Sequence, residues 1–169
     1  LAGKLRDYQF EGVRWLIAAA EAARGALLAD DMGLGKTLQV IALLRWLATC
    51  EQPANCEQLP QKAALIVCPT SLVYNWSAEF QKFAPDLHVN ILHGSSRVIH
   101  RDIHIQFCVF LTSYALLSRD LDAHIKNCYQ AVILDEASYI RNPATLVAQA
   151  ACKLNPPVRV SLTGTPVEH

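Results

Sequence analysis

Short apolar runs alternate along this sequence with longer segments of helical periodicity. The apolar runs are rich in β-branched residues and nearly continuous, which is typical of strands covered on both faces. Strands separated by helices in this way form a parallel sheet. We therefore predict an α/β fold with a largely parallel sheet and helices on both faces. The expected strands are 26–29, 64–68, 88–92, 107–112, 131–135 and 159–164, and the expected helices are 7–22, 36–48, 71–84, 113–118 and 144–153.

Size and charge narrow the class of protein. The 169 residues, 52% of them hydrophobic, suffice for one well-buried domain. Lys plus Arg and Asp plus Glu are equal at 15 each. This balance predicts neither a nucleic-acid coat nor a membrane-surface protein. Any role with nucleic acid therefore has to be argued from motifs.

The sequence also predicts where the protein works. No apolar run approaches the roughly 18 to 20 residues that cross a bilayer, and the first residues lack the apolar core of a signal peptide. The six cysteines form no C-x-x-C pair, and Cys68 and Cys108 fall inside strand-like runs. We expect buried thiols in a reducing compartment. The protein is thus predicted to be intracellular and without a membrane partner, in the cytoplasm if bacterial and in the nucleus if eukaryotic.

The segment "DDMGLGKT", residues 30–37, is similar to a phosphate-binding loop but has Asp30 where the usual pattern has glycine. It follows an apolar strand and precedes a helical pattern, which is the context such a loop requires. Backbone N–H groups and a helix N-terminus would converge on a polyphosphate, with Gly33 and Gly35 allowing close approach and Lys36 supplying charge. The alternative is a glycine-rich turn with an incidental lysine.

A second motif makes that alternative much weaker. In "AVILDEAS", residues 131–138, two carboxylates follow four apolar residues at the C-terminal end of an expected parallel strand. Ligand crevices of open α/β sheets form at this edge. Asp135 would hold Mg²⁺ through its water shell, and Glu136 would orient the attacking water. Acidic capping of a helix N-terminus is the simpler alternative.

Taken together, the motifs resemble those of the Swi/Snf-type ATPases of helicase superfamily two, which include chromatin remodellers and bacterial RapA-like proteins. The resemblance includes Asp30, because this family has an acidic residue there. Six ordered motifs carry it: "LRDYQFEGVRWL" (5–16), "DDMGLGKT" (30–37), "CPTSLVYNW" (68–76), "LTSYALL" (111–117), "DEASYIRNP" (135–143) and "SLTGTP" (161–166).

The resemblance implies a RecA-like P-loop domain that binds ATP and Mg²⁺. Gln9 would read the adenine edge. Lys36, Asp135 and Glu136 would be the catalytic residues, and Thr37 and Asp135 would hold the metal. The implied nucleotide contacts are Gln9, Asp31, Met32, Gly33, Leu34, Gly35, Lys36, Thr37 and Leu38.

Two positions depart from the family pattern. Ser138 stands where the family usually has His or Gln, a position that links the nucleotide site to the motif at 161–166. Ser138 therefore puts in doubt the coupling between the nucleotide site and that motif, rather than ATP binding. Arg141 replaces a lysine and keeps the positive charge.

Contacts with nucleic acid are implied by the same resemblance. Thr70, Ser71 and Asn75 on one side, and Thr112 and Ser113 on the other, are candidates for phosphate contacts, which position a protein without reading sequence. Thr70 or Ser71 could instead cap the helix expected from 71. For Trp76 and Phe80, at positions i and i+4, we favour core packing over base stacking.

The function implied for the whole protein is a DNA-dependent ATPase that translocates on double-stranded DNA and remodels protein–DNA complexes. Two alternatives stay open: a strand-separating helicase or restriction-type translocase, and a catalytically degenerate scaffold. We expect 1–169 to be a single N-terminal RecA-like lobe without the second helicase lobe. Because that lobe carries the arginine finger, the isolated chain is expected to hydrolyse ATP negligibly.

Overall fold

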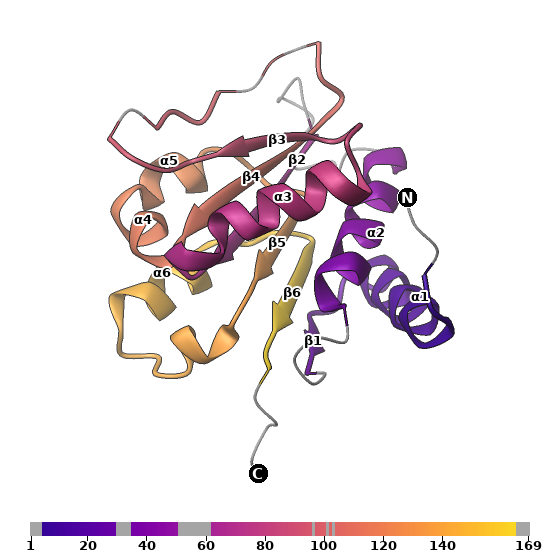
Figure 1. Ribbon diagram of the computed structural model, residues 1–169. Helices are drawn as coiled ribbons and strands as arrows, with labels where there is room; N and C mark the ends of the chain where they lie inside the picture. The colour runs from indigo at the N-terminus through magenta and orange to yellow at the C-terminus, as the bar shows by residue number, and fades with distance from the viewer. Residues whose placement is uncertain are drawn as a thin grey trace.

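The computed structural model describes residues 5–29, 35–50, 62–95, 97–100, 102 and 104–164. Within them, six strands form one sheet in the order β1-β6-β5-β2-β4-β3, and every neighbouring pair is parallel (Figure 1). The strands are β1 (Ala26–Leu28), β2 (Lys62–Cys68), β3 (His88–Ile91), β4 (Phe107–Ser113), β5 (Ala131–Leu134) and β6 (Val158–Leu162). The predicted α/β fold with a parallel sheet is confirmed.

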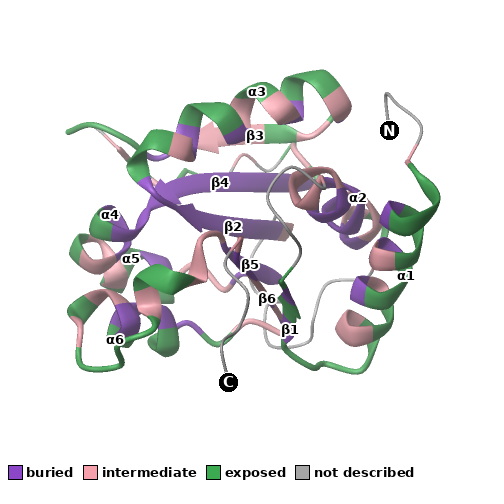
Figure 2. Cartoon of the chain, turned by 60° about the horizontal axis from the view of Figure 1, so that its bottom comes forward, coloured by how far each residue is buried: buried purple, intermediate pink, exposed green. Residues whose placement is uncertain are grey.

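Helices lie on both faces of the sheet (Figures 1 and 2). They are α1 (Asp7–Glu21), α2 (Lys36–Thr49), α3 (Val73–Phe83), α4 (Tyr114–Arg119), α5 (Leu121–Ile125) and α6 (Leu146–Lys153), with short 3₁₀ helices η2 (Thr70–Leu72) and η3 (Ala137–Ile140). The central strands are buried on both sides (Figure 2). The near-continuous apolar character of their sequences follows from this double cover.

Alternate residues of the central strands β2, β4 and β5 supply two separate cores, because successive side chains point to opposite faces. In β2, Ala64, Ile66 and Cys68 pack with α1, α2 and α3. The intervening Ala63, Leu65 and Val67 pack with α4 and α6. The sheet therefore lies between two helical layers that share no core residue.

Most predicted elements agree with the observed ones to within one or two residues. The helix expected from 71 begins instead with the 3₁₀ turn η2 and becomes α-helical at Val73. Such turns are common at helix N-termini. Helices α5 and η3 were not predicted. Each has no more than five residues, so neither completes two turns of a periodic pattern.

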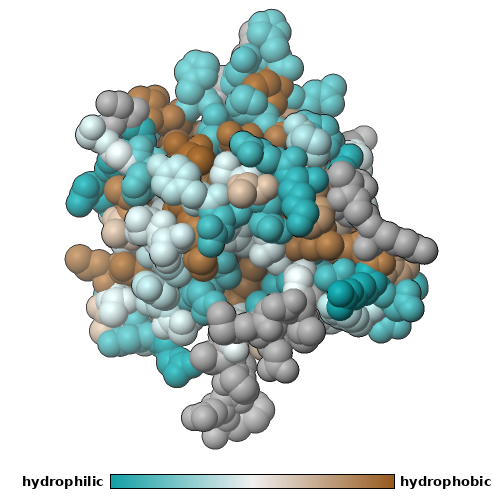
Figure 3. Space-filling model, viewed as in Figure 1, coloured by the Kyte–Doolittle hydropathy of each residue, from teal (hydrophilic) through white to brown (hydrophobic). Residues whose placement is uncertain are grey.

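Cys68 and Cys108 are buried thiols that form no disulfide, as predicted. Cys128 is disulfide-bonded, so the expectation of free thiols throughout is wrong. Within the described ranges, no helix combines the length and the apolar character needed to cross a membrane. On the face seen in Figure 1, hydrophilic and hydrophobic residues are interspersed (Figure 3), in keeping with the neutral net charge.

Candidate nucleotide site

The sheet order brings three distant motifs to one edge. Because all strands are parallel, their C-terminal ends meet at the same side of the sheet. Strand β6 lies between β1 and β5, so the C-terminal ends of these three strands lie side by side. The Thr163 amide continues this pairing by donating to the Leu28 carbonyl at 3.2 Å.

Gln9 is held against the start of α2. Gly35 has φ +78° at the N-cap of this helix, and a Cβ there would lie 2.2 Å from Gln9 Nε2. Glycine is thus required both by the left-handed backbone and by the close approach. Gln9 Oε1 accepts a hydrogen bond from the Arg6 amide at 3.0 Å, and the side chain is buried. The structure therefore places Gln9 beside the end of the phosphate-loop motif.

The phosphate loop itself is described only from Gly35 onward. The predicted contacts Asp31, Met32, Gly33 and Leu34 lie outside the described residues, as does the end of the motif at 161–166. Lys36, Thr37 and Leu38 form the first turn of α2 and are half-buried. They are at the helix N-terminus, where a phosphate group is stabilised by free N–H groups and the helix dipole.

Asp135 follows β5 and is held by four hydrogen bonds. Its amide donates to the Val67 carbonyl at 2.8 Å. Its Oδ1 accepts from the Glu136 amide at 2.9 Å, and its Oδ2 accepts from Trp76 Nε1 at 2.8 Å. Its main-chain carbonyl accepts from the Tyr114 hydroxyl at 2.7 Å. Asp135 is thereby fixed by both its backbone and its carboxylate.

The charge of Lys36 acts on the same carboxylate. Burial raises the pKa of Asp135, and the hydrogen bonds from Trp76 and the Glu136 amide, together with the Lys36 ammonium, oppose that rise. Burial, followed by the Asp135 charge, raises the pKa of Tyr114, which keeps this hydroxyl a hydrogen-bond donor. Lys36 and Asp135, about a hundred residues apart in sequence, thus belong to one electrostatic site.

Glu136 has a left-handed backbone, with φ 51° and ψ 58°. This conformation costs a residue with a Cβ roughly 1–2 kcal/mol. Backbone strain of this kind clusters at functional sites. Glu136 is followed by η3, where exposed Ser138 donates from its hydroxyl to the Glu136 carbonyl at 3.4 Å. Tyr139 stacks on Tyr114 with ring centroids 5.3 Å apart.

The predicted nucleic-acid residues fall into two groups. Thr70, Ser71 and Asn75 are exposed at the start of α3. Leu72 occupies the N-cap position of this helix, and no side chain caps it, so the capping interpretation of Thr70 and Ser71 is wrong. The exposed group is therefore available to a ligand.

The second group lies inside the protein. Thr112 is fully buried, and its hydroxyl donates to the Leu92 carbonyl at 3.5 Å. Ser113 is also buried, and its hydroxyl accepts from the Leu116 amide at 3.3 Å, which caps α4. Both residues belong to β4, which helices cover on both faces. In this conformation neither hydroxyl reaches solvent.

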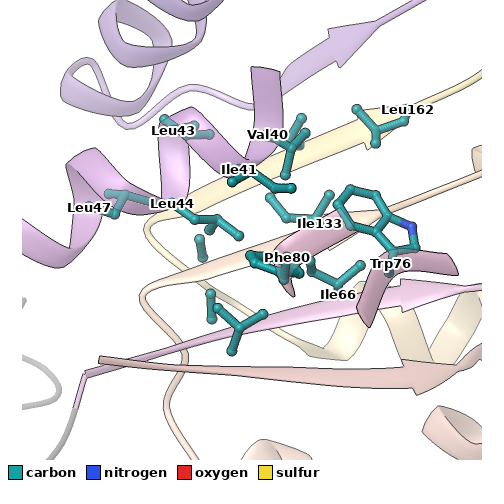
Figure 4. Close-up of a cluster of buried hydrophobic side chains, with 14 of the residues drawn as sticks. Val40, Ile41, Leu43, Leu44, Leu47, Ile66, Trp76, Phe80, Ile133 and Leu162 are labelled. Carbon is teal, nitrogen blue, oxygen red and sulfur yellow. The ribbon is translucent and has the colours of Figure 1, made fainter. Parts of the chain in front are cut away.

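Trp76 and Phe80 confirm the preference for core packing. Their exposed fractions are 3% and 1%, and Figure 4 shows them in one apolar cluster with Ile66 and Ile133. The polar contacts of Trp76 and Tyr114 with Asp135 were not predicted. Hydrophobic periodicity reports which face a ring occupies, and it carries no information about the partner of an N–H or O–H group.

Comparison with known proteins agrees with this architecture. The family described as SNF2-related domain matches residues 8–169, and the chain belongs to this family. The SWI2/SNF2 ATPase core of Sulfolobus solfataricus in complex with dsDNA has a TM-score of 0.82 and 34% identity, covering 99% of this chain and 33% of that one. The RecA-like character of the fold is thereby established.

Among curated relatives, the ISWI chromatin-remodeling complex ATPase ISW2 of Saccharomyces cerevisiae is 36% identical over 99% of this chain. The putative ATP-dependent helicase/translocase YwqA of Bacillus subtilis is 38% identical over 99%. The chain spans 15% of the length of the first relative and 18% of the second. It thus corresponds to a small part of each.

Proposed function

We propose that this chain is the ATP-binding lobe of a DNA-dependent ATPase that translocates along double-stranded DNA and remodels protein–DNA complexes. The observation that carries the proposal is the position of Asp135, which follows β5 at the C-terminal edge of the sheet, is held by Trp76 Nε1 and the Glu136 amide, and lies within reach of the Lys36 charge. Similarity to an ATPase core solved with dsDNA supports the nucleic-acid partner. Relatives described as a chromatin-remodeling complex ATPase and a putative helicase/translocase support translocation and remodelling as the activity.

The residues at this edge suit Mg²⁺ and ATP. The Asp135 carboxylate and the Thr37 hydroxyl are oxygen donors, which Mg²⁺ prefers. When bound, the metal would neutralise charge on the phosphates. Lys36 would hold the β- and γ-phosphates as a point charge, and Glu136 would orient the attacking water. Gln9, fixed beside Gly35, would hydrogen-bond the adenine edge.

Exposed Thr70, Ser71 and Asn75 would contact the DNA backbone. Their hydroxyl and amide groups suit phosphate oxygens and give no sequence specificity. Buried Thr112 and Ser113 would instead support the shape of the neighbouring segment. Binding to duplex DNA would weaken steeply with salt, because phosphate contacts release counterions.

The test is the ATPase rate of the full-length protein that contains this chain, alone and with duplex DNA, single-stranded DNA or RNA. We expect strong stimulation by duplex DNA and loss of activity in Lys36→Ala. Stimulation only by single strands, together with unwinding of a forked duplex, would favour a strand-separating helicase. A rate near zero with every nucleic acid would favour the scaffold, and Ser138→His would then be the first variant to restore coupling.

A further inference from the structure

Trp76 joins α3 to Asp135 through a buried hydrogen bond. The two residues are 59 positions apart in sequence, and the indole Nε1 lies 2.8 Å from Asp135 Oδ2. The indole ring packs against Phe80 with centroids 6.1 Å apart and points into the cluster shown in Figure 4. Only 3% of Trp76 is exposed, so its N–H group has a fixed direction.

The second carboxylate oxygen is held differently. Oδ1 accepts from the amide of Glu136, the next residue in the chain. The terminal torsion of an aspartate is broad and roughly two-fold, so one donor leaves the carboxylate plane free to turn. Two donors on different oxygens fix that plane. Apolar packing alone needs no N–H group at this position, because phenylalanine would fill the same layer of the core.

We propose that Trp76 is a positioning residue that fixes the Asp135 carboxylate in the orientation needed to bind Mg²⁺. This inference rests on the proposed function, in which Asp135 holds the metal. Trp76 also follows exposed Asn75 in α3, and the same helix begins beside exposed Thr70 and Ser71. The Trp76 side chain thus connects α3, whose exposed beginning carries the nucleic-acid candidates, to the Asp135 carboxylate that is proposed to bind Mg²⁺.

Tyr114 provides a matched control, because it also donates a hydrogen bond to Asp135. Its hydroxyl donates to the main-chain carbonyl of Asp135 rather than to the carboxylate. Trp76→Phe and Tyr114→Phe each remove one hydrogen bond to Asp135 and keep an aromatic ring. Only the first change frees the carboxylate plane.

The experiment is a Mg²⁺ titration of nucleotide binding by the full-length protein, with a fluorescent ATP analogue as the probe. For Trp76→Phe we expect the half-saturating Mg²⁺ concentration to rise about tenfold or more, as is typical when a partner of a metal ligand is lost. Binding of the analogue in EDTA should match wild type. For Tyr114→Phe the Mg²⁺ dependence should change by less than about twofold, since both carboxylate donors remain.

An unchanged Mg²⁺ dependence in Trp76→Phe overturns the inference while leaving the proposed function intact. Wild-type protein that binds the analogue without any Mg²⁺ dependence overturns both. If Trp76→Phe does not fold, benzothienylalanine at position 76 replaces the N–H group with sulfur and keeps the shape of the indole. The same rise in the half-saturating Mg²⁺ concentration is expected there, and its absence contradicts the role of the N–H group.

Discussion

Glu136 combines a proposed catalytic carboxylate with an unfavourable backbone conformation. Its φ of 51° lies in the left-handed region, where a Cβ approaches the following carbonyl oxygen. The surrounding hydrogen bonds of Asp135 and the turn into η3 hold the chain in this shape. The residue that would orient water is thus presented on a strained main chain, whose cost the fold has to offset.

This strain predicts that two substitutions of Glu136 differ in stability, although both lose activity. We expect the free energy of unfolding of Glu136→Gly to exceed that of Glu136→Ala by about 1 kcal/mol, because glycine adopts φ > 0 without a Cβ clash. Both variants should lose ATP hydrolysis in the full-length protein. Urea denaturation of the two variants gives the comparison, and equal stabilities would show that position 136 stores no strain.

His124 is a buried titratable group away from the nucleotide site. Its exposed fraction is 1%, and its Nδ1 lies 2.8 Å from the Tyr129 hydroxyl. Burial lowers the pKa of His124 to about 4, although the nearby Asp120 charge opposes the shift. The imidazole is therefore neutral in the folded protein at neutral pH.

The lowered pKa predicts instability in mild acid. In the unfolded chain His124 regains its ordinary pKa of about 6.5 and binds a proton that the folded state excludes. Stability from this group is complete above pH 6.5 and is lost as the pH falls toward 4, by about 3 kcal/mol in total.

The pH dependence of unfolding in wild type and in His124→Asn measures this loss. Asparagine keeps a polar group near the position of Nδ1 but does not titrate. We expect the stability difference between the two proteins to shift in favour of His124→Asn as the pH falls from 6.5 to 4. A difference that is constant with pH would contradict the burial argument. The raised pKa of Asp135 affects both proteins alike and cancels.

Helices α1 and α2 pack through two reciprocal contacts between glutamine and glycine. Gln9 of α1 lies against Gly35 at the start of α2, and Gln39 of α2 lies against Gly12 of α1, where an added Cβ would be 1.9 Å from Gln39 Oε1. Together the contacts set the position of α1, and with it Gln9, relative to the N-terminus of α2. Within the described structure, neither side-chain amide atom of Gln39 has a hydrogen-bond partner.

An unsatisfied buried amide predicts a stabilising substitution. We expect Gln39→Met, which keeps an unbranched side chain of similar length, to raise the free energy of unfolding by roughly 1–3 kcal/mol. Thermal and urea denaturation measure the change. A loss of stability instead would mean that a buried water or another partner satisfies the amide. Gly12→Ala, which brings a methyl group onto Gln39, is expected to destabilise the same contact.

The central parallel strands could be predicted because a strand buried on both faces has an almost continuous run of apolar residues. The apolar runs at 64–68 and 131–135 need no knowledge of their neighbours to be recognised. The short helices α5 and η3 left no comparable signal, because one turn of helix has no periodicity. The pattern also did not predict which residues near the strand ends are exposed. Ser71 comes shortly after β2 and is exposed, whereas Ser113 is the last residue of β4 and is buried.

At the scale of the molecule, two helical layers enclose one sheet, and the candidate site occupies one edge of it. The positions of Lys36, Asp135 and Glu136 after parallel strands could be predicted from motifs, because ligand crevices of such sheets form at this edge, while their catalytic roles stay predictions. The partners of Asp135 could not, since Trp76 and Tyr114 reach it only through the strand order. That order places β5 beside β2 and is set by the packing of the whole sheet.

The limited span of the chain predicts a slow enzyme in isolation. It covers 33% of the solved ATPase core that it resembles, and an arginine finger supplied from elsewhere is typically worth about 10³ to 10⁵ in turnover. We expect the 169-residue chain to hydrolyse ATP more slowly than the full-length protein by a factor in that range. Steady-state ATPase assays of both test this, and comparable rates would show that no finger from another part of the protein is needed.

The pairing of β1 with β6 has a consequence for how the protein is made. Ala26 pairs with Val160 and Leu28 with Leu162, so among the described strands the one that leads into the phosphate-loop motif pairs only with β6, more than a hundred residues later in the sequence. Contacts between such distant residues form late, because a long loop has to close first. A ribosome must release residues 26–162 before β1 can join the sheet. The strand before the phosphate-loop motif thus waits for a partner that is made more than a hundred residues later, and we expect nucleotide binding only once these two strands have paired.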